Sequence, residues 1–133
     1  MPSLVHVPAS HIDKAWRDGA HQLSKACETS ETTPDQLKLL LSRGERMLLA
    51  IMDQGPVGWL TASVQQFPNI RALHVGEIYA PGAMFEECWH QLVQMAYDAG
   101  CSEIRCSAKD TQARLYRMRF GFQPIYTVCK VRI

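Results

Sequence analysis

The chain has 133 residues, 47% of them hydrophobic and 20% charged, which predicts a single globular domain over residues 1–133 and excludes a disordered chain. Its formal net charge is only +1, so it lacks the basic surplus with which nucleic-acid-binding proteins contact phosphates. No apolar run approaches the ~20 residues of a spanning helix, and the first residues lack a signal-peptide pattern, so we expect a cytoplasmic protein without membrane contact.

A short strand and a long helix are predicted first. Val5 and Val7 alternate with polar neighbours, which is typical of a strand. Ser10 is a suitable cap for the helix that follows. The apolar residues of this helix are spaced so that they share one face; they are Ile12, Trp16, Ala20, Leu23 and Cys27.

The second helix begins with a signal that has a physical mechanism. Thr33 is placed to cap the helix, and Gln36 can complete a capping box with it. Pro34 has the φ that a first helical turn requires. Gly44 then ends the helix.

Three strands with short connections follow. They are expected at Met47–Met52, Val57–Val64 and Arg71–Tyr79. The segments between them contain Gly, Pro and Asn, which favour turns. Connections this short predict an antiparallel meander.

The rest of the chain alternates between helices and strands. A helix with an apolar face from Phe85 to Ala99 is followed by a strand at Glu103–Cys106, a helix at Thr111–Phe120 and a last strand at Phe122–Val131. A strand–helix–strand unit after a meander predicts an α/β (α+β) fold with a mixed, mostly antiparallel sheet and helices on both faces. The pattern leaves open whether the last strand joins its own sheet or that of a neighbour.

Five cysteines are scattered through the chain, at Cys27, Cys88, Cys101, Cys106 and Cys129. An odd, scattered set argues against a disulfide framework, and no pair has the spacing of a zinc knuckle. We therefore expect small buried residues in a reducing compartment and no metal site.

The order of these elements resembles that of the GNAT acyltransferase family. Residues 53–62, Asp-Gln-Gly-Pro-Val-Gly-Trp-Leu-Thr-Ala, look like that family's second hairpin, and residues 99–106 look like a helix end and its fifth strand. Residues 113–126, which include Gly-Phe-Gln-Pro, resemble its last helix and strand. The length and a Pro-Gly loop also resemble the compact GNAT-like proteins of tailed-phage genomes, which implies a host cytoplasm or a virion as the location.

The resemblance implies a cofactor site at the start of the helix after the fourth strand, where GNAT enzymes bind the pyrophosphate of acyl-CoA. The matching residues are Tyr79, Gly82, Ala83, Met84 and Phe85. Helix-start amides attract phosphate, but this loop lacks the family's Arg or Gln and its second small residue, and Pro81 removes one donor. Glu86 and Glu87 are expected to repel a diphosphate by about 1 to 4 kcal/mol at ~4 Å. The alternative is an ordinary helix start with stabilising acids.

The resemblance also implies two catalytic candidates. Glu77 lies where the family often has a carboxylate base, and it alternates in phase with Leu73 and Val75, so we expect a partly buried site; a solvent-facing carboxylate is the alternative. His74 is then expected on the opposite face. Tyr116 resembles the tyrosine that protonates the leaving thiolate. The family usually has three residues between this tyrosine and Gly-Phe, whereas this chain has four, and one extra residue turns a helix by about 100°. The alternative for Tyr116 is a core tyrosine.

Two functions follow from the resemblance. One is an acetyl-CoA-dependent N-acetyltransferase that acts on a small primary amine, with Glu77 as base and Tyr116 as acid. The other is a GNAT-fold protein without a cofactor that serves in assembly or interaction, through protein partners or self-association, in a phage virion for example. The altered loop favours the second, because fold does not fix function. A basic cluster on the last helix could hold an acidic partner or simply face solvent; it comprises Lys109, Arg114, Arg117 and Arg119.

Overall fold

The computed structural model describes residues 1–133. The strands are β1 (Ser3–Val7), β2 (Met47–Met52), β3 (Pro56–Gln66), β4 (Arg71–Tyr79) and β5 (Glu103–Cys106). The helices are α1 (Ile12–Asp18), α2 (Ser24–Cys27), α3 (Pro34–Ser42), α4 (Met84–Glu87), α5 (Trp89–Asp98) and α6 (Asp110–Phe120), with short 3₁₀ turns η1 (Ala9–His11) and η2 (Ala20–Leu23). No helix combines the length and the apolar character needed to cross a bilayer.

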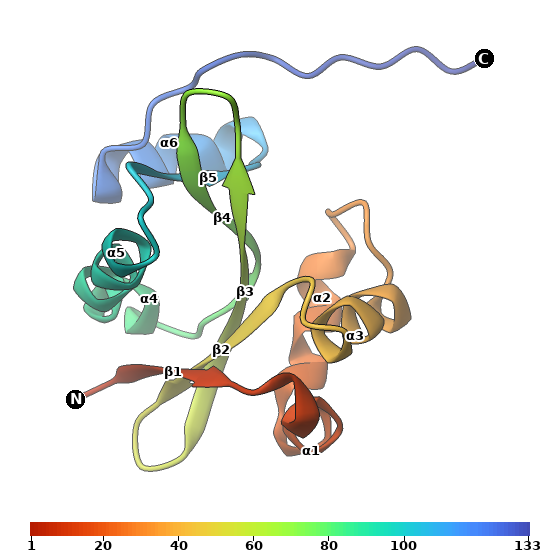
Figure 1. Ribbon diagram of the computed structural model, residues 1–133, viewed down its shortest axis with the longest axis vertical. Coiled ribbons are helices and arrows are strands. Elements are labelled where there is room, and N and C mark those ends of the chain that lie inside the picture. Colours follow the sequence, from red (N-terminus) through yellow and green to blue (C-terminus); the bar gives the residue numbers. More distant parts are fainter.

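A five-stranded sheet in the order β1-β2-β3-β4-β5 forms the centre of the molecule (Figure 1). Neighbouring strands are antiparallel from β1 to β4, and β5 is parallel to β4. Helices α1, α2 and α3 cover one face, and α4 and α5 cover the other (Figure 1). The predicted α/β class, with a mixed, mostly antiparallel sheet, is confirmed.

Each face of the sheet has its own hydrophobic core. The core beneath α1 to α3 includes Ile12, Leu23, Leu37, Leu41, Leu48 and Trp59. The core beneath α5 includes Leu49, Leu60, Leu73, Val75, Leu92 and Ala96. Successive residues of a strand point to opposite faces, so β2 and β3 supply both cores.

The first predicted helix is interrupted. Gly19 has a φ of +149°, so α1 ends before it, and η2 and α2 continue the segment. A Cβ at Gly19 would lie 3.1 Å from Nε1 of Trp59, so the glycine also permits close packing. The predicted apolar face is nevertheless buried, with Trp16 partly exposed at its edge. Ser10 lies in η1 and does not cap α1, whose N-cap is His11.

The predicted start of the second helix is confirmed. The backbone N–H of Gln36 donates to Oγ1 of Thr33 at 3.3 Å, and the N–H of Thr33 donates to Oε1 of Gln36 at 3.0 Å. Pro34 is the first helical residue. A capping box depends on residues three apart, which is why a local pattern predicts it.

The predicted last strand at Phe122–Val131 is wrong. Residues 121–133 have no regular secondary structure, and the chain runs away from the body to a free end (Figure 1). Gly121 ends α6 in the left-handed region, with a φ of +78°. We call residues 122–133 the arm. Its alternation of apolar residues is typical of a strand, but a strand forms only with a partner, and none is paired with the arm here.

Candidate functional site

Strands β4 and β5 pair over only part of β4. Their register runs from Ala72 opposite Glu103 to Val75 opposite Cys106, and β4 continues to Tyr79 without β5. The space where they part, which we call the β4–β5 split, is lined by Val75, Ile78, Phe85, Cys106, Tyr116 and Phe122. Two of the residues predicted from the sequence to form a site, Phe85 and Tyr116, line this split.

A β-bulge in β4 determines where Glu77 points. The pairing register shifts between Leu60 and Ala62 of β3, so that Thr61 stands opposite two residues of β4, Gly76 and Glu77. One extra residue in a strand reverses the alternation of faces beyond it. Side chains of β4 after the bulge therefore lie on the opposite face from the one that simple alternation predicts.

Glu77 accordingly lies on the face covered by α2, and the prediction that it shares a face with Val75 is wrong. Val75 belongs to the core beneath α5, whereas Glu77 bonds to Thr61 on the other face. The expectation that His74 and Glu77 lie on opposite faces is also wrong. His74 lies opposite Ser63 of β3. Ser63 and Thr61 are two residues apart in that strand, so they share a face, and this is also the face of Glu77.

Both carboxylate oxygens of Glu77 are already engaged within the protein. The side chain is buried, and Nη1 of Arg46 donates to Oε1 at 2.9 Å and to Oε2 at 3.3 Å. The Thr61 hydroxyl donates to Oε1 at 3.0 Å and accepts the Glu77 backbone N–H at 3.0 Å. Glu77 is thus the anionic half of an ion pair. To act as a base it would have to give up one of these donors and reach a substrate proton.

His74 is half-buried beside this ion pair. Burial lowers the pKa of His74, and Arg46 lowers it further, while Glu77 opposes the shift. Protonation therefore favours the unfolded chain, and the free energy of unfolding should fall as the pH drops below the unfolded pKa of 6.5 and on through the lower folded pKa.

We expect His74→Gln to flatten this part of the pH dependence. Urea denaturation of the wild type and of His74→Gln, from neutral to mildly acidic pH, would give the free energy of unfolding of each protein. The difference between the two free energies at each pH measures the contribution of His74. His11→Gln is a matched control because His11 is exposed. A difference between wild type and His74→Gln that does not change with pH would contradict the assignment.

Tyr116 lies in the split, among residues of the core beneath α5. Burial raises the pKa of Tyr116, and Cys106 adds to this, so the phenol keeps its proton and can donate it. Helix α6 is continuous through Phe120, so the extra residue before Gly121 is accommodated without a helical bulge. Tyr116 and Glu77 therefore flank the same strand but lie towards opposite faces of the sheet.

The split is filled by aromatic side chains. The ring centroids of Phe85 and Phe120 are 5.2 Å apart, and those of Trp89 and Phe120 are 4.5 Å apart. Phe122 lies 5.7 Å from Trp89 and 5.8 Å from Tyr116. The cavity that remains has a volume of about 10 Å³, which is room for about one water molecule.

Tyr79, predicted to contact a cofactor, faces the helices of the first third of the chain. Its hydroxyl accepts a hydrogen bond from Nε2 of Gln22 at 3.2 Å. Nζ of Lys25 lies 6.0 Å from the centre of its ring. Tyr79 is therefore directed away from the turn that enters α4.

The other predicted cofactor residues form the turn into α4. Gly82 and Ala83 are exposed, and Gly82 has a φ of +63°. Met84 and Phe85 pack against the core beneath α5. Helix α4 ends at Glu87, so the predicted long helix is divided at Cys88 into α4 and α5.

An ion pair changes the charge at this helix start. Nη1 of Arg119, at the end of α6, donates to Oε1 of Glu86 at 2.5 Å, whereas Glu87 is exposed. The expectation of two uncompensated carboxylates therefore applies only to Glu87. From the sequence, Arg119 was only one member of a basic cluster, because no local pattern links residues this far apart.

The remaining reactive side chains do not form a second centre. Burial raises the pKa of the Cys27, Cys88 and Cys106 thiols, which disfavours the nucleophilic thiolate. All five cysteines are free. No three His, Cys, Asp or Glu side chains lie together in a way that could hold a metal ion.

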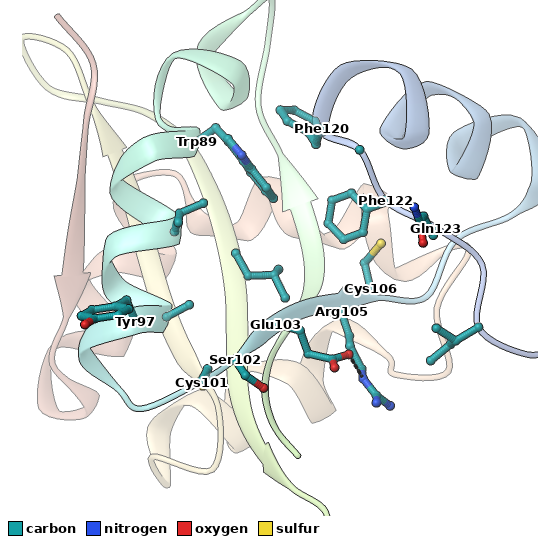
Figure 2. Close-up of a pocket in the computed structure, with 15 residues that line it drawn as sticks. Trp89, Tyr97, Cys101, Ser102, Glu103, Arg105, Cys106, Phe120, Phe122 and Gln123 are labelled. Atoms are coloured by element: carbon teal, nitrogen blue, oxygen red, sulfur yellow. Dashed lines mark hydrogen bonds and ion pairs between the residues drawn. The ribbon is translucent and has the colours of Figure 1, made fainter. Parts of the chain in front are cut away.

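A larger cavity lies between α5, β5 and the base of the arm, and we call it the β5 groove (Figure 2). It has a volume of about 550 Å³, and 10 of its 15 lining residues are hydrophobic. Trp89, Phe120 and Phe122 form one end, and Tyr97 and Ser102 lie at the other (Figure 2). None of the site residues predicted from the sequence lines this groove, because that prediction centred on the split.

Known proteins resemble this chain in structure and not in sequence. No protein-family model and no curated protein matches it. Ribosomal-protein-alanine N-acetyltransferase from Brucella melitensis has a TM-score of 0.73 at 13% identity, with 100% of each chain covered. AAC(6')-Iy, in complex with the bisubstrate analogue CoA-S-monomethyl-acetylneamine, has a TM-score of 0.70 at 14% identity, with 100% of this chain and 98% of that chain covered.

A plant enzyme has the same architecture. Glucosamine-6-phosphate N-acetyltransferase from Arabidopsis thaliana has a TM-score of 0.67 at 13% identity, with 99% of this chain and 98% of that chain covered. Likeness at such low identity concerns the fold and not the activity. The chain therefore has the GNAT fold of the acetyltransferases of known structure.

Proposed function

We propose that this GNAT-fold chain works through protein contacts, as an assembly or interaction protein, and does not turn over acyl-CoA. The observation that supports this most is the filled β4–β5 split, whose remaining cavity is about 10 Å³. The turn into α4 adds to it, because Met84 and Phe85 are packed inward and Glu87 leaves a negative charge where a diphosphate would bind.

The surface supports the interaction half of this proposal. Large hydrophobic side chains are exposed on α6 and the arm: Leu115, Met118, Ile125, Tyr126, Val128, Val131 and Ile133. These residues are concentrated on one helix and the segment that follows it, and apolar side chains gathered at a surface are typical of an interaction site. The resemblance to compact phage proteins suggests a virion as the setting.

An N-acetyltransferase acting on a small primary amine is the second candidate. It is favoured by Tyr116, a protonated phenol in the split. Glu77 lies on β4 and would serve as the base only after leaving its ion pair with Arg46. AAC(6')-Iy, of the same fold, holds an analogue that joins CoA to an acetylated amine. This candidate requires the aromatic side chains to move out of the split when acetyl-CoA binds.

Isothermal titration with acetyl-CoA distinguishes the two candidates. We expect no saturable heat and no thermal shift at millimolar acetyl-CoA, because the cavity beside Tyr116, the residue that would protonate the thiolate, has a volume of only about 10 Å³ and Glu87 places a negative charge at the turn into α4. Binding at micromolar concentration, with transfer of the acetyl group to any amine in a panel that includes an aminoglycoside, would refute the non-catalytic proposal. Desulfo-CoA is a suitable ligand control, because it keeps the diphosphate and cannot react.

The charge at the turn into α4 can be tested separately. Glu86→Gln together with Glu87→Gln should raise whatever weak affinity for CoA exists by about fivefold, corresponding to about 1 kcal/mol of removed repulsion. The change also frees Arg119 from its partner Glu86. Thermal shift and titration with CoA would measure it.

A matched pair of variants controls this experiment. Glu28→Gln with Glu31→Gln makes the same change in net charge at exposed residues beyond α2. Adding Arg119→Gln to the first pair should cancel most of its gain. An equal gain from the control pair would mean that net charge, and not the charge at this turn, governs CoA affinity.

A further inference from the structure

Helix α6 contacts the body through one side and is otherwise exposed. Only Tyr116 and Phe120 of this helix are partly buried, and both pack among the aromatic side chains of the β4–β5 split. The helix lies at one end of the molecule, beside the arm (Figure 1). Helices of globular proteins are stabilised mainly by the packing of an apolar face. Most of the surface of α6 is therefore free to contact a partner.

The exposed side of α6 combines apolar and basic side chains. Leu115 is 47% exposed and Met118 is 82% exposed. These two residues are three apart, so they are neighbours on the helix surface. Basic residues surround them, at the start of the helix and along it. We call the whole set the α6 face: Lys109, Thr111, Arg114, Leu115, Arg117 and Met118.

The basic side chains of the α6 face have no acidic partner within the chain. Lys109, Arg114 and Arg117 take part in none of its ion pairs. Arg119, at the end of the helix, is in contrast paired with Glu86. Arg114 and Arg117 are three residues apart, and like charges that face each other on a helix destabilise it. Carboxylates supplied by a partner would relieve this repulsion.

Helix α1 provides a comparison within the same chain. It also has two exposed bases three residues apart, Lys14 and Arg17, but Asp13 and Asp18 lie next to them in the sequence and offset their charge. No large hydrophobic side chain of α1 is exposed. In α6 the only acid is Asp110, at the first residue of the helix. The α6 face therefore differs from an ordinary solvated helix surface in its charge and in its exposed apolar residues.

The charge of the surrounding chain favours an acidic protein over a second copy. Residues 105–133 contain one acid, Asp110, and seven bases: Arg105, Lys109, Arg114, Arg117, Arg119, Lys130 and Arg132. A two-fold contact through the α6 face would place two positive surfaces against each other. Nucleic acid would meet phosphate contacts from few bases, and Leu115 and Met118 between those bases would face its phosphates. An acidic protein segment with apolar residues suits both kinds of side chain.

We propose that the α6 face binds an acidic amphipathic helix of a partner protein. The carboxylates of the partner pair with the three unpaired bases, and its apolar side chains cover Leu115 and Met118. Helix α6 has 11 residues, a length of about 16 Å, which matches about three turns of a partner helix. The contact is small and its ion pairs are exposed, so we expect a dissociation constant of tens of micromolar that rises with salt. This inference rests on the proposed interaction role and names the chemistry of the partner.

Fluorescence anisotropy with a synthetic peptide tests the proposal on the full chain. The probe is a labelled helical peptide of about 14 residues, built from Glu, Leu and Ala, with Leu on one face and Glu on both sides of it. We expect saturable binding that weakens at least about fivefold between ~50 and ~300 mM salt. A peptide of the same composition, with its Leu residues scattered around the helix, should bind at least about fivefold more weakly.

Charge variants test the basic residues. Arg114→Gln with Arg117→Gln should weaken binding of the acidic peptide by about tenfold. Lys14→Gln with Arg17→Gln makes the same change in net charge at the same spacing on α1, and should leave the affinity unchanged. Arg114→Glu with Arg117→Glu should abolish binding of the acidic peptide and allow binding of a peptide in which Lys replaces every Glu. Circular dichroism of each variant checks that it is folded.

A second pair of variants tests the apolar residues. Met118→Gln should weaken binding of the acidic peptide about fivefold, because it removes apolar surface that the peptide covers. Leu39→Gln is the matched control, because Leu39 is 49% exposed on α3, outside the α6 face. An equal effect of the two substitutions would show that the peptide does not rest on Met118.

Three results would overturn the proposal: no saturable binding of the acidic peptide, the same affinity for the peptide with scattered Leu residues, or an equal loss from the α1 control pair. Tighter binding of a DNA oligomer or of anionic lipid vesicles would assign the face to another class of partner. If acetyl-CoA is turned over and the peptide binds as expected, the proposed function fails and the docking face stands. If neither binds, the docking face fails and the interaction role stands with another partner.

Discussion

Glu77→Leu is expected to lower the free energy of unfolding by about 3 kcal/mol, because it leaves the Arg46 guanidinium without its partner in a largely buried place. The Glu77 side chain is 5% exposed and that of Arg46 is 29% exposed, so the loss should fall at the lower end of the range for broken buried pairs. The Thr61 hydroxyl loses its acceptor in the same variant. Urea denaturation measures the change.

A double-mutant cycle tests whether the loss comes from the pair. Arg46→Met combined with Glu77→Leu removes both charges, so the double variant should be more stable than the sum of the two single losses predicts. Thr61→Val keeps the ion pair and removes two hydrogen bonds, one donated to the Glu77 carboxylate and one accepted from the Glu77 backbone N–H, so it should cost less, about 2 kcal/mol. A loss below that of Thr61→Val for Glu77→Leu would show that the ion pair has no structural role.

This experiment also bears on function. A residue kept only for proton transfer is often neutral or unfavourable for stability, so its replacement costs little stability or adds some. Glu77 is held by Nη1 of Arg46, just before β2, and by the hydroxyl of Thr61 in β3. A large loss of stability on its removal would assign the residue to the architecture of β4, as the non-catalytic proposal requires.

The sequence predicted those elements that depend on neighbouring residues. The bounds of β2, β4 and β5 match the expected ranges, and the Thr33–Gln36 capping box is present. Apolar alternation and capping act over a few residues, so they can be recognised without a fold. The interruption at Gly19 was not predicted, because it depends on a contact with Trp59, far along the chain.

The candidate site was predicted less well than the fold, for a related reason. Alternation placed Glu77 on the wrong face because one bulge residue shifts the phase of every residue after it. The partners of Glu77 and Glu86, which are Arg46 and Arg119, come from distant segments and have no local signal. For the arm, the local pattern was present but did not decide the structure. Its alternation of apolar residues is typical of a strand, but a strand also needs a neighbouring strand, and none pairs with the arm.

Gly76→Ala is expected to lower the free energy of unfolding by about 1 to 3 kcal/mol, the usual cost of forcing an extra methyl into a packed site. A Cβ at Gly76 would lie 2.7 Å from Oγ1 of Thr61, and that hydroxyl cannot withdraw without breaking its two hydrogen bonds to Glu77. Glycine is therefore required because the bulge directs two residues of β4 at one residue of β3. Urea denaturation measures the loss.

Thr61→Ala supplies the decisive comparison, because it removes the atom that the new methyl would meet. In this background, Gly76→Ala should cost at least about 1 kcal/mol less than in the wild type, a coupling of the size found for residues in contact. Equal costs in both backgrounds would mean that the strain arises elsewhere. Coupling, in contrast, would show that the new methyl meets the Thr61 hydroxyl, as expected where Gly76 and Glu77 of the bulge both stand opposite Thr61.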